Sequence, residues 1–299
     1  MNRKGIKESK ARIVFVICNT IILSAFALIC LLPMLHVLFS SVSNPEWLNG
    51  HRGLVLFPHG FNLVGYKLVF QNKALIRGFM NTMMYVGLNL IFGLGLSMIG
   101  GYVLAKPDLL WKNVIMMMIS FTMLFSGGII PAYINLQNLH MVNTIWAVVL
   151  PGSLNVMNLI LMREAFHSVP ISLLESARLD GAGEYRILWS ISLPLVKPTV
   201  ATISLYLIIG MWNSWFPAAM YLRSRDLYPM QLILREILIV NTDNIISADG
   251  IAGLEENADL YKQLVKYSTI IISSLPMIIL YPFIMKYFQT GIRIGAIKE

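Results

Sequence analysis

Six long apolar runs constrain the fold of this chain more than any other feature of its sequence. An α-helix of about 20 residues crosses the hydrocarbon core of a bilayer and satisfies its own backbone hydrogen bonds there. Hydrophobic residues make up 57% of the 299 residues and charged residues only 13%, about half the usual fraction in a soluble domain. The sequence therefore predicts an all-α integral membrane protein with about six transmembrane helices, over residues 13–40, 79–104, 113–130, 144–162, 199–221 and 267–288.

Two of these runs contain residues that interrupt helices. Gly127, Gly128 and Pro131 lie at the end of the third run, and Pro151 is followed by a glycine inside the fourth. Proline removes a backbone donor, and glycine weakens a helix interior. We therefore expect the third helix to end at the glycine pair and the fourth to be interrupted at Pro151.

The basic residues between the runs predict the orientation of the chain. Cytoplasmic loops of membrane proteins carry an excess of Lys and Arg. With both termini in the cytoplasm, 14 of the 23 Lys and Arg residues fall on that side, counting Lys286 with the carboxyl-terminal tail. Loop charge then explains the net charge of +8, so no nucleic-acid partner is expected. We expect one transmembrane domain over residues 13–288, with cytoplasmic tails over 1–12 and 289–299.

The outer segments 41–78 and 222–266 are long. The stretch Leu227–Arg235 within the second of them is amphipathic. This pattern predicts a short helix at the outer membrane interface, with a plain connecting loop as the alternative.

Several function classes lack support in the sequence. No run carries an ionisable residue near its centre, where proton-driven transporters usually place one. Cys18 and Cys30 both lie in the first run, which indicates neither a disulfide framework nor a zinc site. The chain has no phosphate-binding loop motif, no His-Glu-x-x-His and no Gly-x-Ser-x-Gly. We expect no enzymatic activity, no catalytic residue, no metal site and no cofactor in this chain.

The predicted cytoplasmic segment 163–198 carries the most informative pattern. Ser172 can cap a helix whose apolar face includes Ala177, and Gly181 follows as a break. A second short helix is predicted over Tyr185–Ser192, before two prolines mark the return to the membrane. A compact helix pair of this kind is well shaped to dock into a groove of another protein.

The residues of this segment resemble a known family. The pattern Glu175-Ser176-Ala177-x-x-Asp180-Gly181-Ala182, followed by Ile191-x-Leu193-Pro194-x-x-x-Pro198, is similar to the EAA loop of binding-protein-dependent ABC importers. Ser176 departs from that pattern, which has alanine, but serine is also small. The motif is specific because several residue types recur at fixed offsets.

The resemblance implies that this segment couples the chain to a separate ATPase subunit. The first short helix would be a coupling helix in a cleft of that ATPase, and Glu175 would contact a basic residue there. Gly181 would allow the turn, while Pro194 and Pro198 would set the angle of the fifth span. A plainer interpretation makes Asp180-Gly181 a helix-ending turn and Glu175 a solvated charge. The coupling residues implied are Glu175, Ser176, Ala177, Asp180, Gly181, Ala182, Leu193, Pro194 and Pro198.

The same resemblance implies the partners. Such a permease pairs with a second permease subunit, two copies of an ABC ATPase that bind ATP and Mg²⁺, and an extracytoplasmic solute-binding protein. All of them would assemble at the bacterial cytoplasmic (inner) membrane, around a multi-pass chain in contact with lipid.

Residues late in the fifth run resemble the sugar-importing, maltose-type branch of the family. They form the pattern Trp212-Asn213-x-Trp215-Phe216, and Tyr228-Pro229-Met230-Gln231-Leu232 and the tail from Lys286 to Lys298 are similar as well. Aromatic faces and amides suit sugar rings and hydroxyl groups. The candidate residues of a solute pathway are Asn155, Asn158, Trp212, Asn213 and Trp215. Interface anchoring by tryptophan and helix–helix bonding by asparagine are the plain alternatives.

The function most consistent with these patterns is therefore permease-mediated import of a mono- or oligosaccharide. An ABC importer for a peptide or another small solute is the alternative within the class. A stand-alone channel or secondary transporter, or a membrane anchor, is the alternative outside it, and leaves the loop pattern unexplained.

Overall fold

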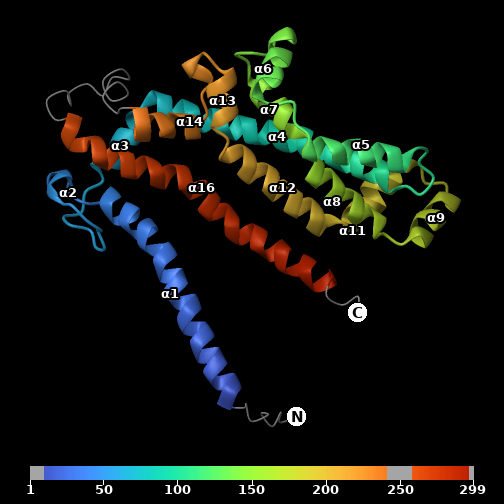
Figure 1. The fold of residues 1–299 in the computed structure, drawn as a ribbon, viewed down its shortest axis with the longest axis horizontal. Helices are drawn as coiled ribbons and strands as arrows, with labels where there is room; N and C mark the ends of the chain where they lie inside the picture. Colours follow the sequence, from blue (N-terminus) through green and yellow to red (C-terminus); the bar gives the residue numbers. More distant parts are fainter. Residues whose placement is uncertain (1–9, 241–257, 296–299) are drawn as a thin grey trace. The chain divides into compact units, whose positions relative to one another are not determined.

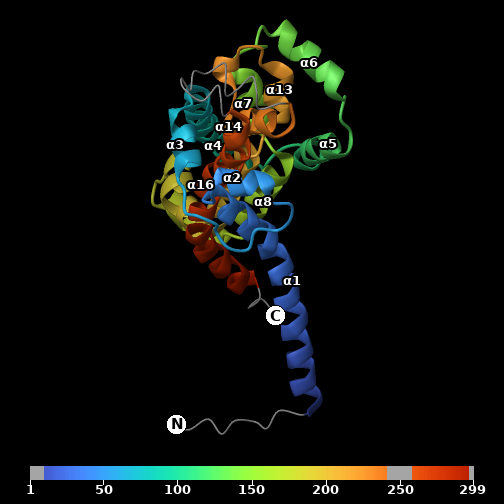
Figure 2. The same cartoon turned by 90° about the vertical axis from the view of Figure 1, so that its left-hand side faces the viewer.

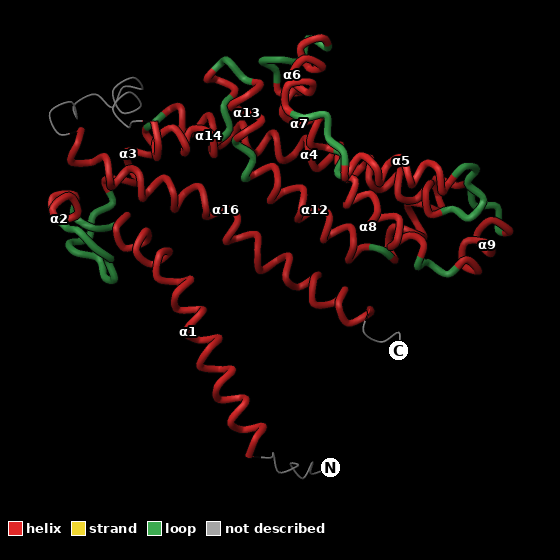
Figure 3. The backbone as a smooth tube through the Cα atoms, in the orientation of Figure 1, coloured by secondary structure: helices red, strands yellow, loops and turns green. Residues whose placement is uncertain are grey.

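The computed structural model describes residues 10–240 and 258–295, and all regular structure in these ranges is helical (Figure 3). The described chain forms two compact units. The first comprises residues 10–72 and 258–272, and the second comprises 73–240 and 273–295. This confirms the predicted all-α fold class.

The first unit contains α1 (Lys10–Ser41), α2 (Pro45–Gly50), α3 (Val64–Gln71) and the first part of α16 (Ala258–Gly295). The side chain of Asn44 caps α2 by accepting a hydrogen bond from the backbone N–H of Glu46 at 2.9 Å. Leu48 and Leu264 are buried together in the small core of this unit. The small core of the first unit therefore lies next to Phe39, near the end of α1.

The second unit contains the remaining elements. They are α4 (Lys73–Ala105), α5 (Lys112–Leu124), α6 (Ile129–Asn138), α7 (Ile145–Ser153), α8 (Val156–His167), α9 (Ile171–Leu179), α10 (Glu184–Arg186), the π-helical η1 (Ile187–Ser192), α11 (Leu193–Leu195), α12 (Lys197–Trp212), α13 (Phe216–Tyr221), the 3₁₀ turn η2 (Arg225–Leu227), α14 (Met230–Arg235) and the π-helical η3 (Glu236–Val240). The long helix α4 is central, because α7, α8, α12 and α14 all pack against it (Figure 1).

Six candidate membrane spans are present, but three of them are bent. The straight ones are α1, α4 and Leu260–Pro282 within α16. The bent ones are α5 with α6 at 114°, α7 with α8 at 44°, and α10–α11 with α12 at 85°. Figure 2 shows the sharp turn between α5 and α6. The predicted number of spans holds only if each bent pair counts as one.

The predicted third span, 113–130, was wrong as a single helix. α5 ends at Leu124 and α6 begins at Ile129, after Gly128 with a φ of 90°. Only glycine adopts this left-handed conformation without strain. α5 therefore ends before the glycine pair rather than at it, and a new helix starts directly after Gly128 in another direction.

The predicted fourth and fifth spans also needed correction. The break in 144–162 comes at Leu154–Asn155 rather than at Pro151, which lies inside α7. The Asn155 side chain accepts hydrogen bonds from the first backbone N–H groups of α8, and this cap explains the new start. The run 199–221 is divided because α12 ends at Trp212 and α13 begins at Phe216, with Pro217 in its first turn.

Glycines on one face of α4 permit close helix packing. An added Cβ at Gly93 would lie 2.6 Å from the carbonyl oxygen of Ser153, and one at Gly101 would lie 3.0 Å from the backbone nitrogen of Arg163. Gly95 does not share this role, since nothing lies within 4 Å of its Cβ position. The backbones of α7 and α8 therefore approach α4 at two specific glycines.

The predicted outer helix is present as α14, but it is not a surface element. Leu232, Ile233 and Leu234 are buried, and the backbone N–H of Met230 donates to the hydroxyl of Thr82 on α4 at 2.8 Å. Its apolar side chains therefore pack within the protein. Residues 241–257 of the predicted outer segment lie outside the described residues.

These contacts predict a difference between two glycines on the same helix. Gly93→Ala should lower stability by about 1–3 kcal/mol, because the clash is with a backbone carbonyl that cannot rotate away. Gly95→Ala should be neutral or stabilising by up to about 1 kcal/mol, since alanine favours helix and the site is open. The measurement is the thermal unfolding midpoint of each variant purified in mild detergent. Equal midpoints would contradict the packing role of Gly93.

Candidate functional site

The segment that resembles the EAA loop forms a helix with a defined end. The backbone N–H of Ala182 donates to the carbonyl of Ala177 at 2.9 Å, and that of Gly181 donates to Arg178 at 3.0 Å. Gly181 has a φ of 81°, so these two hydrogen bonds form a Schellman turn with glycine in the left-handed position. The predicted short helix and glycine break are confirmed.

The start of α9 differs from the prediction. Pro170, rather than Ser172, occupies the capping position, and no side chain caps the first turn. Ser172 lies inside the helix, where its carbonyl accepts a hydrogen bond from the Ser176 hydroxyl at 2.9 Å. Proline is suited to this place because it has no N–H to satisfy.

Most of α9 is exposed. Ala177 is its single buried residue and belongs to a core cluster with Ile187 and Phe166. Leu179 is 89% exposed and Tyr185, just beyond the turn, is 79% exposed. Glu175, Ser176 and Asp180 are exposed as well, and Ala182 is half-buried. We call α9 and the turn after it, residues 171–185, the α9 corner. It is anchored in the core through Ala177, and it exposes both apolar and acidic side chains.

The chain after the turn bends sharply on its way into α12. The predicted helix over Tyr185–Ser192 is present, but Ile187–Ser192 is π-helical. Leu193 begins α11 and Pro194 follows in its first turn, while Pro198 lies in the first turn of α12. The two segments meet at 85°. Both prolines therefore flank the bend, where a missing N–H costs least.

Glu184, which the sequence patterns did not single out, ties α9 to the end of α4. Its carboxylate accepts a hydrogen bond from the Tyr102 hydroxyl at 2.7 Å and forms ion pairs with Lys106 at 2.9 Å and Arg178 at 3.3 Å. Tyr102 lies on α4, and Arg178 lies on α9. One carboxylate therefore links two elements that are far apart in the sequence.

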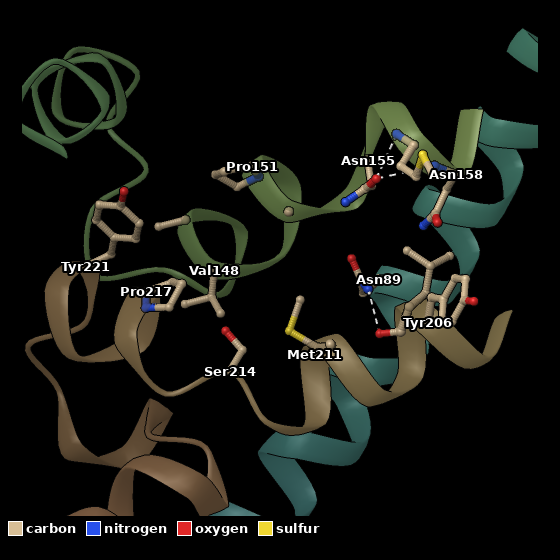
Figure 4. Close-up of a pocket in the computed structure, with 15 residues that line it drawn as sticks. Asn89, Val148, Pro151, Asn155, Asn158, Tyr206, Met211, Ser214, Pro217 and Tyr221 are labelled. Carbon is tan, nitrogen blue, oxygen red and sulfur yellow. Dashed lines mark hydrogen bonds between the residues drawn. The ribbon is translucent and has the colours of Figure 1, made fainter. Parts of the chain in front are cut away.

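A cavity of about 570 Å³ lies beside the middle of α4 (Figure 4). Two of the predicted pathway residues, Asn155 and Asn158, line it together. The Asn155 Oδ1 caps α8 through the N–H groups of Met157 and Asn158. The full lining is Asn89, Ala147, Val148, Pro151, Gly152, Asn155, Met157, Asn158, Tyr206, Leu207, Gly210, Met211, Ser214, Pro217 and Tyr221.

The other three predicted pathway residues do not line this cavity. Trp212 is 2% exposed, and its Nε1 donates to the carbonyl of Ser273 at 3.1 Å. Asn213 bonds back to the carbonyl of Ile209 at 3.0 Å, and Trp215 lies under the Arg235 guanidinium at 4.2 Å. Trp212 is thus a core residue. Asn213 and Trp215 each contact a neighbouring residue of the chain rather than the cavity.

Four lining residues with polar groups were missed from the sequence, namely Asn89, Tyr206, Ser214 and Tyr221. A signal for Asn89 was available, because an asparagine in the middle of an apolar run usually faces the interior of the protein. Among residues 10–240 and 258–295, no group of three or more His, Cys, Asp or Glu side chains is placed to hold a metal ion.

Comparisons with known proteins agree on one family. The family model described as "Binding-protein-dependent transport system inner membrane component" matches residues 7–294. Protein LplC of Bacillus subtilis (strain 168) is 33% identical, over 97% of this chain and 97% of its own length. The polygalacturonan/rhamnogalacturonan transport system permease protein YtcP of the same organism is 33% identical, over 91% and 94%.

One solved structure is similar over nearly the whole chain. It is the crystal structure of a bacterial ABC transporter involved in the import of the acidic polysaccharide alginate. A chain of that structure matches with a TM-score of 0.85 and 30% sequence identity, over 95% of this chain and 100% of its own length.

The contacts of Glu184 predict how α9 is held. Glu184→Ala should speed amide hydrogen exchange over residues 171–182 roughly fivefold, because a charge-assisted hydrogen bond and two exposed ion pairs together contribute about 1 kcal/mol. Glu164→Ala is the matched control, since the Glu164 carboxylate forms an ion pair with the adjacent Arg163 and not with α9. Equal exchange in the two variants would show that Glu184 does not hold α9.

Proposed function

The chain belongs to the family of binding-protein-dependent transport system inner membrane components, and from this premise we propose that it is the membrane-spanning permease subunit of an ATP-driven importer of oligosaccharides. Its location is the bacterial inner membrane. The proposal adds to the family assignment a coupling site, a cargo class and a set of partners.

The exposed corner of α9 is the observation that carries the proposal. A helix of nine residues normally buries its apolar side chains, yet Leu179 at the end of α9 is almost fully exposed, and so is Tyr185 just beyond the turn. Glu175 and Asp180 lie beside them. An apolar centre with charged residues around it is typical of a surface that docks into a partner's groove. We assign this corner to the ATPase subunit, with Glu175 paired to a basic residue of that subunit.

The connections behind the corner give docking a mechanical consequence. Ala177 is packed in the main core of the unit, and Glu184 links Arg178 to Tyr102 of α4. A force on α9 would therefore reach α4 and α12 through packed side chains and short bonds rather than through a loose loop. Leu193, Pro194 and Pro198 define the bend that leads into α12.

The cargo class rests on the relatives and on the cavity. YtcP is named for polygalacturonan and rhamnogalacturonan, and the solved neighbour is named for alginate. The cavity of this chain combines amides with tyrosine rings, which suit hydroxyl groups and the apolar faces of sugar rings. The partners we assign are a second permease, two ATPase copies and an extracytoplasmic solute-binding protein.

Two alternatives make different predictions. An importer for peptides would share the α9 corner but would transport peptides rather than oligosaccharides. A stand-alone channel would transport without ATP. Uptake into proteoliposomes that contain the complete importer, with labelled arabinotriose, maltotriose, trigalacturonate and a tripeptide, separates these cases. ATP-dependent uptake of a trisaccharide supports the proposal, and ATP-independent or peptide-only uptake overturns it.

The turn after α9 provides a sharper test of coupling. Gly181→Ala should reduce ATP-dependent uptake at least about tenfold, because a side chain at a φ of 81° costs roughly 1–2 kcal/mol and displaces the corner. Glu175→Ala should reduce uptake as well, through loss of the pairing charge. Both variants should still insert into the membrane. The measurement is ATP-dependent uptake at equal protein amounts in the membrane.

Gly183→Ala is the matched control for Gly181→Ala. Gly183 has a φ of −70°, which any residue adopts, and nothing lies within 4 Å of its Cβ position. Its uptake should equal that of the unmodified chain. Normal uptake in both Gly181→Ala and Glu175→Ala would refute the coupling assignment.

A further inference from the structure

Trp111, in the loop between α4 and α5, combines an unusual backbone conformation with an exposed side chain. Its φ is 61°, in the left-handed region that bulky residues rarely adopt. Trp111 is 75% exposed, and Leu110 before it is 79% exposed. Among residues 10–240 and 258–295, the indole takes part in no hydrogen bond or ring contact. The described chain therefore does not offset the cost of this conformation, which points to a contact outside the chain.

The loop lies where the chain leaves the membrane and returns to it. Residues 106–111 join the end of α4 to the start of α5, and both helices belong to candidate membrane spans. α4 carries no charged residue after Arg77, so its apolar part extends to the loop. Irregular backbone exposed to lipid does not occur inside the hydrocarbon region, and six residues reach at most about 20 Å. The loop therefore lies at the boundary between the membrane and water.

α5 begins directly after Trp111 and exposes an apolar side. No residue of α5 is buried. Val114, Met118 and Phe121 are exposed, and their spacing of four and three residues places them on one side of the helix. We call Leu110 and Trp111 the loop tip. It is continuous in the chain with a membrane helix whose apolar side is open.

The loop tip has the composition of an interfacial anchor. Tryptophan is enriched at membrane–water boundaries, because its ring is apolar while its N–H needs a polar partner. Lys106 and Lys112 flank the tip, and Asp108 is the single acidic residue of this loop. The Lys112 ammonium donates to the carbonyl of Lys106 at 3.3 Å, and its other two donors have no partner in the described ranges. Lysines in this position attract the anionic phospholipids of the cytoplasmic leaflet.

We propose that the loop tip inserts into the headgroup region of the cytoplasmic leaflet, and that Lys112 binds the phosphate of an anionic phospholipid there. The inference rests on the proposed function, which places the α9 corner and this loop in the cytoplasm. The loop and α9 both line a cavity of about 420 Å³, to which they contribute Asp108 and Leu174 among others. The lipid contact would therefore hold one wall of the cavity beside the coupling corner.

The charges of the two surfaces favour lipid over the ATPase as the occupant of the loop tip. The α9 corner, which we assign to the ATPase, exposes Glu175 and Asp180 and so matches a basic partner surface. The loop tip contains no acidic residue and has a lysine directly after it. An anionic lipid surface matches this tip, whereas a basic ATPase groove does not.

The test measures the depth of the loop tip in the complete importer. Cys18 and Cys30 are replaced by serine, Leu110→Cys is labelled with the fluorophore NBD, and the complex is assembled with its partner chains in nanodiscs of phosphatidylcholine and phosphatidylglycerol. Lipids with a doxyl quencher near the headgroup should reduce the emission at least about twofold, because interfacial anchors lie about 5–10 Å into this region. Leu179→Cys, at a similarly exposed residue of the α9 corner, is the matched control and should keep its emission.

Two further changes test the chemistry of the contact. Trp111→Gly keeps the left-handed backbone without a ring, and it should remove most of the quenching at residue 110. Quenching should increase with the fraction of phosphatidylglycerol. Lys112→Gln should abolish this increase, whereas Lys73→Gln, at the other end of α4, should leave it unchanged.

Several outcomes overturn the inference. Quenching at residue 110 by iodide in water but not by doxyl lipid places the tip in solvent, and protection from both quenchers places it against a protein such as the ATPase. Either result decides against the lipid contact even if Trp111→Gly fails to assemble. Equal quenching in Trp111→Gly, or quenching that does not depend on phosphatidylglycerol, also contradicts it.

ATP-dependent uptake into liposomes of the same lipids separates this inference from the proposed function. Quenching at residue 110 without ATP-dependent uptake of any solute counts against the proposed function and leaves the lipid contact standing. Uptake without quenching counts against the lipid contact alone.

Discussion

The close approach of α7 and α8 to α4 depends on the missing side chains of Gly93 and Gly101, and the rest of the second unit is built around that approach. In an apolar environment, helices gain little from hydrophobic burial against one another, so contact between backbones matters more. Gly93 meets the end of α7, and Gly101 meets the middle of α8. Asn89 on the same face bonds to α12. The helices α7, α8 and α12 therefore all contact the same face of α4.

The broken helices follow from a second constraint, which is that freed backbone groups need partners. A straight span satisfies its own backbone, but a break exposes four N–H groups at each new start. Asn155 satisfies two of these groups at the start of α8 with its side chain. The residues on either side of the break, Gly152 and Asn155, line the cavity, where irregular backbone is tolerated. The cavity and the broken helix are therefore two aspects of the same local structure.

Sequence patterns predicted the elements better than their directions. Apolar runs located the three straight spans and at least one helix of each bent pair, because the length of a hydrophobic run decides whether a helix can cross. The bends of 114° and 85° were not predicted. Gly128 marks a stop in the sequence, but its φ of 90° also redirects the chain, and only tertiary packing decides where. Of the residues chosen from patterns, Asn155 and Asn158 meet at the cavity, whereas Trp212 is buried in the core.

Glu184 and Asn89 were missed because their roles depend on neighbours that are distant in the sequence. Glu184 is an ordinary charge in a polar loop until Tyr102, Lys106 and Arg178 surround it. Asn89 and Tyr102 lie on the same helix, about 20 Å apart at 1.5 Å per residue. One end of α4 thus holds the α9 corner, and its middle forms the cavity wall. α4 is one continuous helix packed against α7, α8, α12 and α14, so a rigid connection between the two regions is expected. The α9 corner proposed for coupling and the cavity are therefore connected through one helix, α4.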